Sequence, residues 1–96
     1  MTLSRRFSYT NQFRDGFKKL HPIDQERVRR VIDDIKKEPD KGKILQRKPL
    51  SFSYRIGDLR VVYEFDDESL TFTACGPRKK VYKRLQETSS RKEDLP

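Results

Sequence analysis

The segment Ser51–Phe65, SFSYRIGDLRVVYEF, decides the fold because it has the pattern of two β-strands joined by a tight turn. Apolar and polar residues alternate on both sides of Gly57 and Asp58, as expected of strands with one buried face. Glycine in the first loop position suits a type II′ turn. This register places Arg55 opposite Arg60, on the face away from the apolar residues. Like charges facing each other across a sheet are destabilising, so the pair calls for a functional explanation.

The flanking segments extend this hairpin into an α+β fold. RRFSYT (residues 5–10) predicts an N-terminal strand, and Thr10 or Asn11 can cap the helix that follows. Helical spacing appears in two sets of apolar residues, Phe13, Phe17 and Leu20, and then Val28, Val31, Ile32 and Ile35. A third strand of the meander is predicted from Leu70, Phe72 and Ala74, which alternate with Thr71, Thr73 and Cys75. We therefore expect the order β-α-α-β-β-β with a short C-terminal helix, the helical hairpin packing on a mainly antiparallel sheet.

The length of 96 residues allows one domain with a single modest core. We expect this domain to span residues 1–86. The last ten residues, 87–96, are almost entirely polar, and we expect them to form a disordered tail.

The formal net charge of +8 predicts a polyanionic partner, with nucleic acid as the first candidate and an acidic protein as the second. No apolar run is long enough to span a bilayer, and the N-terminus lacks the pattern of a signal peptide. A single cysteine, Cys75, fits the reducing cytoplasm. Because the chain has only one cysteine and one histidine, His21, a zinc site is not expected. We predict neither a metal nor a cofactor.

Positive charge gathers in the second half of the chain, and it includes three arginines that can converge on one side of the sheet. Arg55 and Arg60 come from the hairpin, and Arg78 follows the last strand. Guanidinium groups bind phosphate oxygens in pairs and can balance charge that develops on phosphorus. Tyr82 follows Arg78 by four residues, so both can share a helical face. The tyrosine could act on a ribose 2′-hydroxyl, or its ring could simply pack on the sheet.

These residues resemble the C-terminal half of the RelE/ParE toxin superfamily. The family pattern is a Y-R-x-G-D-x-R-x-x-Y hairpin, an acidic turn, a strand and G-x-R-x-x-V-Y, and the resemblance covers about residues 5 to 86. The matching residues are Tyr54, Arg55, Gly57, Asp58, Arg60, Tyr63, Gly76, Arg78, Val81 and Tyr82.

The resemblance implies a RelE-like mRNA interferase, which is a metal-independent endoribonuclease that cuts mRNA on the ribosome, and a RelB-like antitoxin as partner. By motif position, Arg60, Arg78 and Tyr82 would be the catalytic residues. Further RNA-binding cations would be Arg47, Lys48, Arg55, Lys79 and Lys80.

One departure concerns the pair of lysines that the best-known RelE toxins carry on the strand before the turn. Ser51 and Ser53 occupy those positions here, and Arg47, Lys48 or Arg55 could substitute for the lysines. This departure leaves open an RNA-binding domain without catalytic activity. A separate alternative is a ParE-like toxin that inhibits gyrase, and the presence of Arg78 and Tyr82 counts against it.

Overall fold

The computed structural model describes residues 5–47 and 50–81, which form an α+β fold with a five-stranded mixed sheet. In chain order the elements are β1 (Arg6–Tyr9), α1 (Asn11–Lys18), α2 (Pro22–Lys37), the 3-10 helix η1 (Pro39–Lys41), β2 (Lys43–Arg47), β3 (Leu50–Ile56), β4 (Leu59–Phe65) and β5 (Ser69–Pro77). The strand order is β1-β5-β4-β3-β2. Only β1 and β5 pair in parallel, so the predicted fold class, with its helical hairpin and mainly antiparallel sheet, is confirmed.

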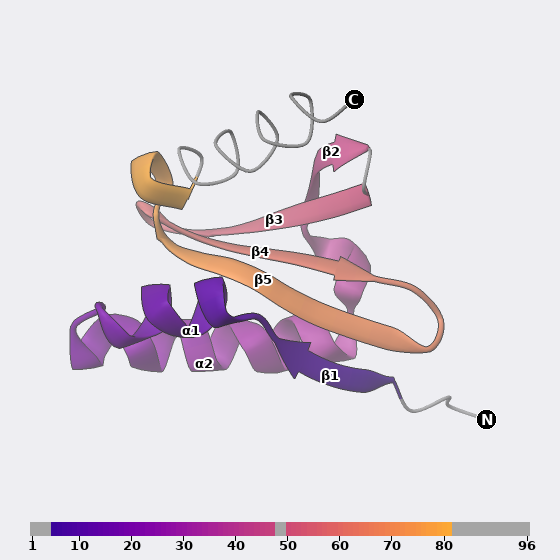
Figure 1. The fold of residues 1–96 in the computed structure, drawn as a ribbon, viewed down its shortest axis with the longest axis horizontal. Coiled ribbons are helices and arrows are strands. Elements are labelled where there is room, and N and C mark those ends of the chain that lie inside the picture. The colour runs from indigo at the N-terminus through magenta and orange to yellow at the C-terminus, as the bar shows by residue number, and fades with distance from the viewer. Residues whose placement is uncertain (1–4, 48–49, 82–96) are drawn as a thin grey trace.

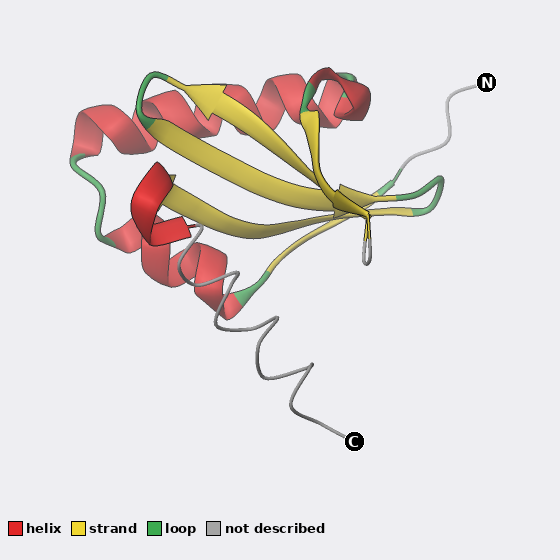
Figure 2. Ribbon diagram, turned by 90° about the horizontal axis from the view of Figure 1, so that it is seen from above, coloured by secondary structure: helices red, strands yellow, loops and turns green. Residues whose placement is uncertain are grey.

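Helices α1 and α2 lie together on one side of the sheet (Figure 1), and a view from above shows the strands in front of them (Figure 2). Thr10 caps α1, since its hydroxyl accepts a hydrogen bond from the Phe13 amide at 3.1 Å and donates one to the Thr73 carbonyl at 2.7 Å. The core between the two layers consists of Phe13, Val28, Val31, Ile32, Ile35, Leu59, Val61, Tyr63, Leu70, Phe72 and Cys75. Both predicted helical stripes therefore face the sheet.

The register predicted for the central hairpin is confirmed. Arg55 pairs with Arg60, and Ile56 pairs with Leu59. Of the two loop residues, only Gly57 has a positive φ, at 59°, which fits a type II′ turn because a type I′ turn needs positive φ at both positions. The two arginines thus share the sheet face that points away from α1 and α2.

The strand β2 was missed in the sequence because KILQR is short, begins and ends with a cation, and shows no clean alternation. Its stability comes from pairing with β3, where a bulge between Ile44 and Gln46 further disturbs the pattern. The sheet therefore has one more strand than predicted, and this strand forms the edge beside the hairpin.

The alternation predicted for β5 was wrong after Phe72. The register between β4 and β5 shifts between Val62 and Tyr63, and this bulge reverses the faces of the residues that follow on β5. As a result Cys75 joins the core beneath the helices, whereas Ala74 packs with Val62 and Val81 on the opposite face.

The C-terminal part of the chain is described only as far as Val81. Residues 78–81 are helical, in agreement with the start of the predicted C-terminal helix. The boundary at residue 86 and the tail predicted at 87–96 lie outside the described residues. Within the described ranges, no helix has the length and apolar character needed to cross a membrane, and no cluster of potential metal ligands is found there.

The buried thiol of Cys75 predicts a loss of stability at alkaline pH. Burial raises its pKa from 9.0 to about 12, so the unfolded chain releases this proton at lower pH than the folded protein does. The thiol's contribution is thus complete below pH 9 and is lost as the pH rises toward the folded pKa. We expect a loss of about 1 kcal/mol at pH 10 in urea titrations, and Cys75→Ala should flatten this dependence. The prediction would be contradicted if the free energy of unfolding of Cys75→Ala fell as steeply as that of the wild type between pH 8 and 10.

Candidate nucleic-acid interface

A hollow of about 530 Å³ opens on the sheet face opposite α1 and α2. It is lined by Lys41, Gly42, Lys43, Ile44, Leu45, Ser53, Tyr54, Arg55 and Arg60. Four of these residues are cations and none is a carboxylate, so its lining carries charge of a single sign. Such a hollow attracts anions, and two guanidinium groups favour a phosphate or carboxylate over a halide because they donate in a planar fork.

Arg60 is the most enclosed cation of the hollow, with a side chain in the middle of the sheet and an exposed fraction of 9%. Its neighbours across the two adjoining strands are Arg55 and Gly76. Because glycine has no side chain, β5 does not crowd the guanidinium from that side. Arg55 is exposed, and its Nε donates to the Gly57 carbonyl at 3.0 Å, which ties the side chain to the hairpin turn. The hollow therefore combines one enclosed and one accessible guanidinium group.

The two lysines of the hollow lie where the chain passes from α2 into β2, because Lys41 ends η1 and Lys43 begins β2. Tyr63 fixes this segment from within the core. Its hydroxyl donates to the Pro39 carbonyl at 2.5 Å and accepts from the Gly42 amide at 3.0 Å. These two bonds bracket Lys41 and directly precede Lys43. We call this arrangement the Tyr63 clamp.

Replacing Tyr63 with phenylalanine tests the Tyr63 clamp. The change keeps the buried ring but removes both hydrogen bonds, which leaves the Pro39 carbonyl and the Gly42 amide without their partner. We expect the free energy of unfolding to fall by about 1–3 kcal/mol in urea denaturation. Hydrogen exchange should also accelerate at the Gly42 amide more than at amides of α1. Wild-type stability together with wild-type exchange at Gly42 would contradict the clamp.

The structure brings Arg55, Arg60 and the backbone of Arg78 to the same end of the sheet. The Arg78 amide donates to the Asp58 carbonyl at 3.1 Å, so the helical turn that begins at Arg78 is tied to the hairpin loop. The Arg78 side chain is exposed and is not among those lining the hollow. Lys79 is exposed on the same turn.

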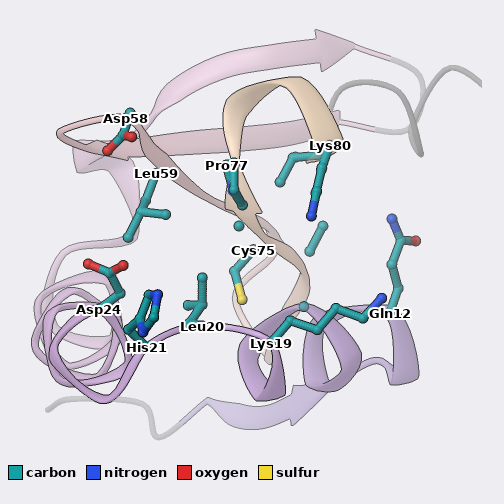
Figure 3. Close-up of a pocket in the computed structure, with 14 residues that line it drawn as sticks. Gln12, Lys19, Leu20, His21, Asp24, Asp58, Leu59, Cys75, Pro77 and Lys80 are labelled. Carbon is teal, nitrogen blue, oxygen red and sulfur yellow. The ribbon is translucent and has the colours of Figure 1, made fainter.

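Other predicted site residues lie elsewhere or outside the described residues. Lys80 lines a second, smaller cavity of about 210 Å³ between α1 and β5, together with His21, Asp24, Asp58 and Cys75 (Figure 3). This cavity carries both signs of charge and an apolar floor, so it lacks the anion-binding character of the hollow. Arg47 belongs to β2, but its side chain is not described. Lys48 and Tyr82 lie outside the described residues.

Lys41 and Lys43 are lining residues that the sequence did not identify as site residues. They were recognisable only as cations before the hairpin, because the strand that carries Lys43 was not predicted. The register between β2 and β3 supplies the missing information, since it places Lys43 opposite Ser53.

The fold, with a helical hairpin on one face of the sheet and the arginine pair on the other, is a RelE-like toxin fold. Among solved structures, the toxin–antitoxin complex RelBE2 from Mycobacterium tuberculosis matches with a TM-score of 0.69 and 28% identity, over 81% of this chain and 95% of that one. The archaeal RelE–RelB complex from Pyrococcus horikoshii matches with a TM-score of 0.66 and 20% identity, over 79% and 97% of the chains. A mutant of the E. coli toxin RelE in the free state matches with a TM-score of 0.69 and 15% identity, over 84% of this chain and 93% of that one.

The last two likenesses concern the fold alone, given their low identity. No protein-family model and no curated protein sequence matches the chain.

Proposed function

We propose that this protein is the toxin of a type II toxin–antitoxin system and that it cleaves mRNA on the ribosome. The observation that carries the proposal is the arginine pair of the hollow, held in a RelE-like fold whose solved neighbours are RelE toxins and RelB–RelE complexes. Like charges directly opposite each other across a sheet are destabilising, and an anion bound between the two guanidinium groups would offset that repulsion. An RNA phosphodiester is the anion that best fits both the paired guanidinium groups and the net charge of the chain.

The proposed reaction is an attack within one nucleotide. The ribose 2′-oxygen forms a bond to the adjacent phosphorus, and the bond from phosphorus to the 5′-oxygen of the next nucleotide breaks. The proton of the 2′-hydroxyl leaves with the acting base, and the departing 5′-oxygen gains a proton. The products are a 2′,3′-cyclic phosphate and a 5′-hydroxyl, so the step needs no oxidant and no external nucleophile.

Within this proposal the guanidinium groups supply charge stabilisation. Arg60 would contact the scissile phosphate from the enclosed side of the hollow, and Arg55 would contact a neighbouring phosphate from the open side. Negative charge on the phosphate oxygens grows as the attack proceeds, and an enclosed donor stabilises such charge more than an exposed one does. Arg78 and Tyr82 are proposed as further catalytic residues on their motif positions, and Lys79, Lys80, Arg47 and Lys48 as contacts to the RNA or ribosome.

The proposed protein partner is a RelB-like antitoxin. The solved M. tuberculosis and P. horikoshii neighbours are complexes of this kind. An antitoxin with acidic residues would complement the net charge of +8 and could cover the hollow.

The test is to incubate the purified protein with programmed ribosomes and map the mRNA ends. We expect cuts at the ribosomal decoding site, with a cyclic phosphate on the upstream product and a 5′-hydroxyl on the downstream product. Gyrase-dependent DNA breaks in place of mRNA cleavage would support the ParE-like alternative. Salt-dependent RNA binding without any product ends would support the RNA-binding alternative, and either result would overturn the proposal.

A further inference from the structure

We propose that Lys43 is a phosphate-binding residue of the hollow, and that the Tyr63 clamp serves to hold it there. This inference rests on the proposed function for the identity of the anion, which is RNA. The inference assigns a role to a residue of β2, and none of the motif residues that carry the family resemblance lies on that strand.

The first support is the position of Lys43 in the sheet. Lys43 pairs with Ser53, and Ser53 is two residues before Arg55 on β3. Residues two apart on a strand share a face, and directly paired residues of antiparallel strands lie about 5 Å apart at Cβ. Lys43 therefore lies one residue row from the Arg55–Arg60 pair, on the same face. The row spacing of about 7 Å is close to the distance between successive phosphates of an extended RNA strand.

The second support is the chemistry of the neighbours in that row. Ser53 pairs on its other side with Val62, so neither residue that follows Lys43 across the sheet carries a charge. Lys43 is exposed, and in the part of the chain that the structure describes it makes no ion pair. Serine is short, so a lysine side chain can extend over it toward Arg60. The row of Lys43, Ser53 and Val62 thus carries one cation, and the adjoining row carries two, Arg55 and Arg60.

The third support is the anchoring of the segment. Lys43 follows Gly42, whose amide is bonded to the buried Tyr63 hydroxyl, and Tyr63 has no exposed surface. A lysine on an unanchored loop would lose conformational entropy on binding a phosphate. A lysine that begins a strand and directly follows a glycine held by a core hydrogen bond has little backbone freedom left to lose, so it binds at lower cost.

The experiment uses the full chain and two readouts, cleavage of ribosome-bound mRNA and binding of a single-stranded RNA oligonucleotide over a range of salt. We expect Lys43→Ser to lower cleavage by about 10- to 100-fold. In the binding assay it should reduce the steepness of the plot of log affinity against log salt by about 0.7, the value for one lost phosphate contact on single-stranded nucleic acid. Lys43→Arg should keep the slope. Lys18→Ser, an equal change of charge on an exposed residue of α1, should leave the cleavage rate and the slope unchanged.

A swap variant sharpens the test. Because the two side chains are opposite each other, Lys43→Ser combined with Ser53→Lys returns a lysine to the same row from β3. We expect this double variant to recover cleavage to within about threefold of wild type. If the wild type cleaves mRNA while Lys43→Ser equals it in rate and salt slope, the inference fails and the proposed function stands. If the wild type does not cleave but Lys43→Ser reduces the salt slope, the proposed function fails and the phosphate contact stands.

Discussion

Replacing Arg60 with alanine is expected to lower the rate of mRNA cleavage by about 10²–10³-fold without unfolding the protein. Arg60 is the enclosed cation of the hollow, with 9% of its surface exposed, so no other described side chain of the hollow has the same environment. The substitution removes the repulsion from Arg55 across the hairpin but also removes buried aliphatic packing. These effects oppose each other, and we expect the free energy of unfolding to change by less than about 1 kcal/mol.

The measurement is the initial rate of cleavage on programmed ribosomes, paired with urea denaturation of the same preparation. Arg30→Ala is the matched control, because Arg30 is an exposed arginine of α2 on the other side of the sheet. It changes the net charge equally and should keep the wild-type rate. Arg60→Lys should recover only part of the activity, since an ammonium group cannot donate as a planar fork. An Arg60→Ala protein that is unfolded would show that this arginine is structural, and an active one would show that it is not catalytic.

The second large effect is expected at Gly16, where alanine should lower the free energy of unfolding by about 3 kcal/mol. A Cβ atom at this position would lie 2.2 Å from the carbonyl oxygen of Cys75, so α1 could not pack on β5 at its present distance. The added Cβ is fixed to the backbone of α1 and the carbonyl oxygen belongs to the backbone of β5, so the clash can be relieved only by shifting the helix or the strand. The outcome is the reverse of the usual gain of about 0.5–1 kcal/mol when alanine replaces glycine inside a helix.

Urea denaturation at neutral pH measures this effect, with Asp15→Ala as the control in the same helix. Asp15 is exposed, so its replacement should leave stability unchanged or raise it slightly. Gly16→Ala with wild-type stability or better would contradict the described contact between α1 and β5.

The parts of the fold that could be predicted are those in which one periodic pattern persists over a whole element. The apolar stripe from Val28 to Ile35 and the alternation around Gly57 each specify a buried face, so the helical hairpin and the central register followed. There are physical reasons why two other features could not be predicted. The strand β2 depends on its partner β3 for stability, and the bulge on β5 depends on packing that a single sequence does not display.

In the candidate site, too, the features set by local sequence could be predicted, and those set by long-range contacts could not. The Arg55–Arg60 pair was predictable because it lies within the hairpin, where local turn chemistry determines the register. Lys43 was not, because its place depends on pairing with a strand that the pattern did not reveal. The Tyr63 clamp was equally hidden, since it joins residues separated by 24 and 21 positions in the chain.

The central claim is that RNA phosphate binds in the hollow between Arg55 and Arg60. The most direct measurement is a structure of the protein on a ribosome programmed with mRNA that carries a 2′-O-methyl group at the cleavage position. We predict a backbone phosphate oxygen within about 2.7–3.0 Å of the Arg60 guanidinium, with a neighbouring phosphate near Lys43. An mRNA path that leaves the hollow empty, such as one along the cavity between α1 and β5, would contradict the claim.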